Sequence, residues 1–331
     1  MKNYFKVILP EKFNRFLQRL FVYLRKIQLP GFEGMGLYDV LKFFVVGLLD
    51  SKFTLIASAM SYQFFFSLFP TLLLVFLILP HIPIEGIEET TLDFIMQFLP
   101  GSGDSGLGQD ELTEMVEDIV SHYFEGRGSF TLIIVSIFLA LWGATRGIIA
   151  MMKAFTKNEE VFKKRNIFQL YGMAFFIFLV LGMLGLLAVV GIWLGTHGLG
   201  YLMAEGVMSP FWYDILSQVI SFIFLGATIF FGISTLYYLA PATHERWKFF
   251  SPGSIGAGAL MMVAIIGLRY FFANFANFDR LYGSLGAIIL LMVWFYYISI
   301  MLLIGFELNA AIDIAAYHGE KSEEDEAFPI T

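Results

Sequence analysis

The sequence predicts an all-α polytopic membrane protein with six transmembrane helices, an N-terminal amphipathic helix and an extracytoplasmic helical hairpin. Apolar residues make up 58% of the 331-residue chain and charged residues 15%, whereas soluble domains average about 45–50% and about 25%. The apolar residues also gather in six runs, each reaching the roughly 20 residues that a bilayer-spanning helix needs. A chain of this composition would expose too much apolar surface to stay soluble as a monomer.

Residues 1–54 are basic, with nine Lys and Arg against four Asp and Glu. Within them, residues 11–28 place apolar side chains at helical spacing and basic side chains on the rest of the helix wheel. This pattern is typical of an amphipathic helix that binds anionic lipid headgroups at the membrane surface. Packing of the same helix on the protein's own cytoplasmic side is the alternative. A second amphipathic segment, Leu37 to Leu49, leads into the first span.

The first span, near residues 57–80, is apolar but carries polar side chains and a proline. Its polar residues lie in the first half, and they include Ser58, Ser61, Tyr62 and Gln63. Pro70 predicts a helix kink, because its ring removes a backbone hydrogen bond and leaves the carbonyl of Phe66 to be satisfied by another group. We therefore expect the polar face of this span to point toward other helices or toward a wet cavity.

Residues 81–128 change character, with eleven acidic residues against a single base, Arg127. Two helical patterns, from Ile87 to Leu99 and from Glu111 to Phe124, are separated by a glycine-rich turn. This segment is expected to form the acidic helical hairpin on the outer face.

Five further spans are predicted near residues 129–152, 168–196, 211–240, 252–276 and 283–312. Gly191 and Gly195 form a GxxxG pattern, which predicts close packing of the third span against another helix. Residues 313–331 are expected to form an acidic cytoplasmic tail, and its last part, residues 320–331, is expected to be disordered.

The connections between spans alternate in basic residues, which predicts the orientation of the protein. The connection 153–167 has five Lys and Arg and 241–251 has two, whereas 197–210 has none and 277–282 has one. Both termini should therefore be cytoplasmic, with the acidic hairpin outside.

Four ordered motifs resemble those of the YihY/virulence factor BrkB family of bacterial inner-membrane proteins, formerly labelled ribonuclease BN. They are ASAMSYQFFFSLFPTLL, LWGATRGIIAMMKAFTKN, LAPATHERWKFFSPGSIGAGAL and YGSLGAIILLMVWFYYISIMLLIGFELNA. The resemblance runs from about Leu37 to Ala311. It implies a six-span protein of the bacterial inner membrane and little chemistry, although transport has been suggested for some members.

The residues favour neither an enzyme nor a cofactor site. The chain has no cysteine and five scattered histidines, whereas a metal-dependent nuclease needs clustered His, Asp and Glu to hold ions and activate water. No glycine-rich phosphate loop or HExxH pattern occurs. No nucleic-acid partner is expected, because lipid headgroups explain the basic N-terminal helix.

Polar residues within the spans form a candidate cluster near the inner side of the membrane. Counted along the spans at about 1.5 Å per residue, a shared depth is expected for Ser58, Ser61, Tyr62, Gln63, Arg146, Glu307 and Asn309. Intramembrane charges are costly and commonly functional. Arg146 and Glu307 could form a structural pair or could belong to a transport path.

Two classes of function remain open at this stage. One is a transporter or lipid-handling protein with a polar inner-side cavity and an unknown substrate. The other is a non-transporting envelope scaffold. A transporter should show a partly polar cavity that reaches into the membrane, whereas a scaffold should have a tightly packed helix bundle without a water-filled cavity. An oligomer is compatible with either class.

Overall fold

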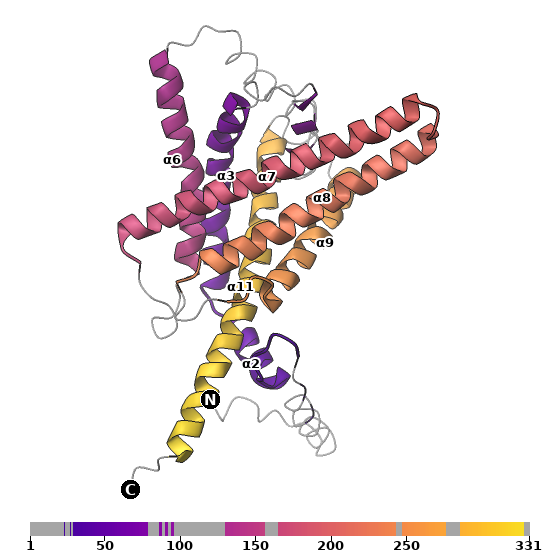
Figure 1. Cartoon of the computed structure of the whole chain (residues 1–331). Coiled ribbons are helices and arrows are strands. Elements are labelled where there is room, and N and C mark those ends of the chain that lie inside the picture. Colours follow the sequence, from indigo (N-terminus) through magenta and orange to yellow (C-terminus); the bar gives the residue numbers. More distant parts are fainter. Residues whose placement is uncertain are drawn as a thin grey trace.

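The computed structural model describes residues 29–78, 130–155, 165–242, 247–275 and 285–327, together with a few isolated positions before residue 96. Every regular element within these residues is a helix, which confirms the all-α prediction (Figure 1). The helices are α2 (Leu37–Leu48), α3 (Phe53–Ile78), α6 (Phe130–Ala154), α7 (Ile167–Ala204), α8 (Pro210–Leu239), α9 (Pro252–Phe275) and α11 (Leu285–Ala327).

Five of these helices, α3, α6, α7, α8 and α11, are long and apolar enough to cross a membrane. Helix α9 corresponds to the remaining predicted span, but its apolar stretch within the described side chains, Pro252–Leu268, is shorter. The structure therefore supports a multi-pass membrane protein.

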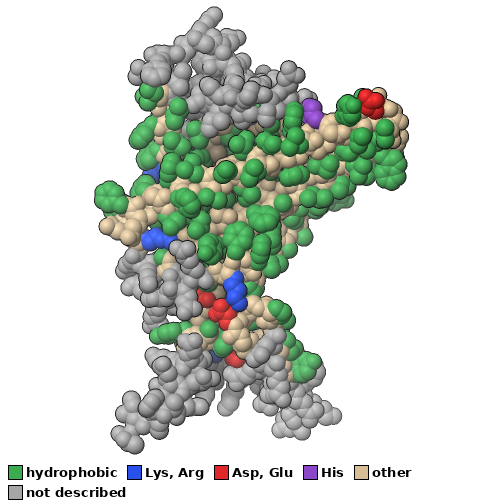
Figure 2. All heavy atoms as spheres, viewed as in Figure 1, with side chains coloured by type: hydrophobic (Ala, Val, Ile, Leu, Met, Phe, Trp, Pro, Cys, Tyr) green, Lys and Arg blue, Asp and Glu red, His purple; other side chains and the backbone are tan. Residues whose placement is uncertain are grey.

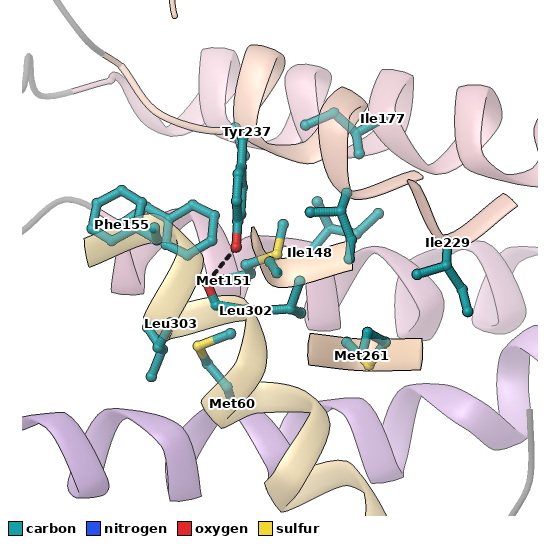
Figure 3. Packing of buried hydrophobic residues seen from close by; sticks show 14 of the residues in the cluster. Met60, Ile148, Met151, Phe155, Ile177, Ile229, Tyr237, Met261, Leu302 and Leu303 are labelled. Atoms are coloured by element: carbon teal, nitrogen blue, oxygen red, sulfur yellow. Dashed lines mark hydrogen bonds between the residues drawn. The ribbon is translucent and has the colours of Figure 1, made fainter. Parts of the chain in front are cut away.

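Contacts link the long helices in a closed ring, in which α3 packs on α6, α6 on α7, α7 on α8, α8 on α9, α9 on α11, and α11 on α3. Each of these helices sends side chains into one apolar core (Figure 3). Its largest fully buried members include Met60 of α3, Met151 of α6 and Leu303 of α11. The Tyr237 hydroxyl of α8 donates a 2.5 Å hydrogen bond to the carbonyl of Leu302, so the polar atom of this buried ring is satisfied.

Helices α7 and α8 form a long hairpin that slants across the other helices and projects beyond them (Figure 1). Gly191 and Gly195 lie against Phe224 and Ile220 of α8, so close that an added Cβ would come within 3 Å of each partner. This confirms the packing predicted from the GxxxG pattern. Helix α7 continues to Ala204, past the predicted end at residue 196, because no proline interrupts it before the left-handed Gly206.

Apolar side chains cover the outside of the α7–α8 hairpin, with few charged groups among them (Figure 2). Large exposed members include Met183, Leu187, Trp212 and Phe222. Such a surface is unstable in water and is expected where helices face lipid acyl chains.

Helix α2 packs beside the later part of α11 (Figure 1). Val40 is fully buried there against Ala311, Ile312 and Ala315. Leu41, Val45 and Leu49, which share the predicted apolar face, are instead exposed. One side of this face therefore packs on the protein, and the other remains available to the membrane.

The expectation of disorder over residues 320–331 is wrong for most of this stretch, because α11 continues to Ala327. The physical reason is composition, since Ala, Glu and Lys are strong helix formers and they dominate this segment. In Figure 1 the end of α11 extends away from the bundle.

Most of the predicted N-terminal helix at 11–28 and most of the predicted outer hairpin lie outside the described residues. Two described positions of that hairpin, Ile87 and Phe94, are buried in the main apolar core. The hairpin segment therefore contacts the bundle at these points.

Candidate functional site

A groove of about 540 Å³ lies between α3, α6 and the start of α7. Two residues of the predicted polar cluster, Gln63 and Arg146, line it together. The remaining lining residues are Lys52, Ile56, Ala59, Met60, Ile149, Ala150, Lys153, Ala154 and Tyr171. Among the described lining residues three side chains are basic and none is acidic, so this part of the groove is cationic.

The guanidinium of Arg146 lies 4.6 Å from the centre of the Trp142 ring, one helical turn earlier on α6. This cation–π contact is favourable, particularly away from water. It places the central guanidinium carbon over the indole ring. The contact therefore holds the end of the Arg146 side chain beside Trp142.

The groove lies beside the core of the bundle and does not pass through its centre. Met60 and Ile149 line the groove and also belong to the buried apolar core. By contrast, Ala59 and Arg146 of the same lining are exposed. The groove is therefore open at the side of the helix ring, while the centre of the ring is packed with apolar side chains (Figure 3).

The other polar residues of α3 do not line this groove. The hydroxyl of Ser58 donates to the carbonyl of Thr54, and that of Ser61 donates to the carbonyl of Ser58, both within α3. Tyr62 is 52% exposed, and its ring centre lies 4.6 Å from that of Phe66. These three side chains are therefore placed outside the groove.

Helix α3 continues through Pro70, whose ring faces Gly143 of α6 so closely that a Cβ there would lie 2.5 Å from its Cγ atom. Thr71 donates to the carbonyl of Ser67, in the turn where Pro70 removes a backbone bond. The glycine opposite gives the proline ring its space. The kink itself stays a prediction.

Glu307 is not among the groove residues that surround Arg146, and the pairing of these two residues stays a prediction. Its carboxylate lies against Gly47 of α2, where an added Cβ would come within 2.4 Å of the Oε2 atom. In the helix ring, α3 stands between α6 and α11. Phe306 faces the core, and the next residue is turned by about 100° around α11, which directs Glu307 toward α2 instead.

Asn309 also lies outside the groove, at a buried junction between α9 and α11. Its Oδ1 atom accepts a 2.8 Å hydrogen bond from the backbone N–H of Gly253, and its Nδ2 atom donates to the Ser251 hydroxyl at 2.8 Å. Gly253 and Gly305 bring the two backbones together. We call Ser251, Gly253, Ser254, Gly305 and Asn309 the α9–α11 junction.

Sequence reasoning missed the three other polar lining residues of the groove, Lys52, Lys153 and Tyr171. The two lysines stand at the ends of α3 and α6, where basic residues indicate orientation rather than a site. Tyr171 lies on α7, which the sequence does not place beside α3. Their shared spatial position becomes visible once the order of helices in the ring is known.

Arg165, one of the basic residues used above to predict the orientation, also has a structural role. Its guanidinium donates to the carbonyls of Leu239, Ala240 and Pro241 at 2.6–3.1 Å. Carbonyls at a helix end lack partners within the helix, so Arg165 caps α8 and fixes the connection before α7.

Comparison with known proteins places the chain among membrane proteins. The sequence profile of the virulence factor BrkB family matches residues 44–329. The chain is 28% identical over 264 residues to the ribonuclease-like protein YfkH of Bacillus subtilis, covering 77% of this chain and 88% of that one. It is 27% identical over 272 residues to a UPF0761 membrane protein of Aliivibrio salmonicida, covering 80% of each. No solved structure matches the chain.

Proposed function

We propose, from the premise that the chain belongs to the virulence factor BrkB family, that it handles an amphipathic substrate of the inner membrane through the groove between α3, α6 and α7. The supporting observation is the position of the groove at the side of the bundle, together with the packed centre of the ring. A lateral groove suits a substrate that approaches through the lipid, whereas a soluble solute would need a wet path through the bundle.

The location and orientation are part of this proposal. The protein is placed in the bacterial inner membrane with both termini cytoplasmic, from the alternation of basic residues in its connections. In this orientation the groove lies toward the cytoplasmic ends of α3 and α6, where Lys52 and Lys153 stand.

We do not extend the ribonuclease-like name of the Bacillus relative to this chain. The groove offers cations, an amide and a phenol. A metal-dependent nuclease instead uses carboxylates and histidines that hold an ion and activate water. The proposed activity is therefore binding and movement of a substrate without hydrolysis.

A non-transporting envelope scaffold is the second candidate. The apolar packing at the centre of the ring favours it, since a scaffold needs a stable bundle and no path. The open cationic groove is the feature that a scaffold leaves unexplained.

A flip assay separates the two candidates. The full chain is reconstituted in vesicles that contain short-chain fluorescent phosphatidylglycerol or fluorescent ceramide, which lacks phosphate. The lipid-handling function predicts faster transbilayer movement of at least one probe than in protein-free vesicles. Ala59→Trp and Ala150→Trp, which fill the groove, should abolish most of this gain.

Val263→Trp is the matched control, because Val263 is exposed on α9 and does not line the groove. It should retain the activity of the unmodified protein. Equal rates with and without protein, or full activity after filling the groove, would favour the scaffold.

A further inference from the structure

The groove gathers positive charge from two helices. Lys52 comes from the start of α3, whereas Arg146 and Lys153 come from α6, two helical turns apart, or about 10 Å along the axis. Because none of the lining residues within the described part of the chain is acidic, these residues do not balance the charge of the three bases. Charge at the depth of a membrane is costly unless a counter-charge accompanies it, and an anionic ligand would supply one.

The cations are of types that bind phosphate. Arg presents in-plane N–H donors that match two phosphate oxygens, and Lys acts as a mobile point charge. The cation–π contact with Trp142 restricts the position of the Arg146 guanidinium. The side chain is thus partly ordered before a ligand arrives, which lowers the entropy lost on binding.

The walls between the charged positions are apolar. Ile56, Met60 and Ile149 form this part of the lining. Along α3, the groove runs from Lys52 to Gln63, about 16 Å at 1.5 Å per residue. A small hydrated anion gains no binding energy from an apolar wall. A lipid, by contrast, can place its phosphate at the cations and its glycerol and first acyl carbons along the apolar surface.

We infer that the groove is a binding site for the phosphate group of a membrane phospholipid, held by Lys52, Arg146 and Lys153. The inference deepens the proposed function by naming its substrate class, and it rests on that function in placing the substrate in this groove. Gln63 and Tyr171 are neutral groups of the lining that can bond to ester or headgroup oxygens.

A binding measurement on the full chain in neutral detergent tests the inference. Native mass spectrometry would measure the affinity for short-chain phosphatidylglycerol and, in parallel, for the corresponding diacylglycerol, which lacks phosphate. The double variant Lys52→Gln, Lys153→Gln should bind phosphatidylglycerol at least about tenfold more weakly, because each charge-assisted hydrogen bond contributes that much or more.

The matched control is the double variant Lys42→Gln, Lys248→Gln. It removes the same charge from two exposed lysines that do not line the groove, and its affinity should stay within about twofold of the unmodified protein. An equal loss of phosphatidylglycerol affinity in both double variants, or no loss in either, would overturn the inference. An affinity for diacylglycerol equal to that for phosphatidylglycerol would also overturn it.

A further arm distinguishes the source of the phosphate. Free inorganic phosphate should compete poorly with the lipid, because it cannot use the apolar wall. If it binds as tightly as phosphatidylglycerol, the ligand is a soluble anion and the lipid assignment is wrong. Specific lipid binding without flip activity would support this inference and contradict the proposed function. Flip activity that survives removal of both lysines would support the proposed function and contradict this inference.

Discussion

The groove and the α9–α11 junction are both polar regions of an apolar protein, yet they are built in opposite ways. In the groove, Arg146 is exposed and its guanidinium carbon lies over the Trp142 ring. At the junction, Asn309 is 3% exposed and its amide bonds to Gly253 and Ser251. A polar residue within a span therefore has two distinct uses. It can hold helices together when its bonds are completed within the protein, or it can meet a ligand when it is exposed at a groove.

The strongest test of this contrast is Gly253→Ala at the junction. An added Cβ would lie 2.1 Å from the carbonyl oxygen of Gly305, a backbone atom that cannot move without separating α9 from α11. We expect a loss of about 3 kcal/mol or more, at the upper end of overpacking effects. Thermal unfolding in detergent, followed by size-exclusion chromatography, would measure this loss.

Gly256→Ala is the control on the same helix, since nothing lies within 4 Å of its added Cβ. It should be neutral, or more stable by up to about 1 kcal/mol through helix propensity. Equal stability of the two variants would contradict a close junction.

Asn309→Ala should have the next largest effect. It leaves the buried N–H of Gly253 without its acceptor, which costs about 1–3 kcal/mol. Asn309→Asp keeps an acceptor and loses the amide donor, so its stability should lie between that of Asn309→Ala and that of the unmodified protein. The melting temperature in detergent checks both. Ser58→Ala is the comparison, because Ser58 is exposed and bonds within its own helix; a loss there as large as at Asn309 would refute the distinction.

The smallest expected effect is the coupling between Arg146 and Glu307. Because one lies at the groove and the other faces α2, the stability changes of Arg146→Gln and Glu307→Gln should add within about 0.5 kcal/mol in the double variant. A double-mutant cycle measures this directly. A loss of stability in the double variant that is much smaller than the sum of the two single losses would support the ion pair that the sequence suggested.

The helices themselves could largely be predicted from the sequence, because long apolar runs leave few other structures in a membrane. The ends of the helices were harder to predict. Helix α7 extends to Ala204 and α11 to Ala327, since composition alone does not mark where a helix leaves the lipid.

The candidate site could be predicted only in part. Counting along a span gives the depth of Arg146 or Glu307, and depth suggested a single cluster. It does not give the direction in which a side chain leaves its helix, nor the order of helices around the ring. Gln63 and Arg146 meet because α3 packs on α6, whereas Glu307 and Asn309 face α2 and α9.

The most direct measurement uses the absence of cysteine from the natural chain. Single-cysteine variants Ala59→Cys, in the groove, and Ala310→Cys, buried beside Asn309, would be exposed to a membrane-impermeant maleimide on either side of the membrane. The open groove predicts labelling at position 59 from the cytoplasmic side, slowed by phosphatidylglycerol, and no labelling at position 310 until the protein is unfolded. Equal labelling of both positions, or labelling at position 59 only from the outer side, would contradict the division into an open groove and a sealed junction.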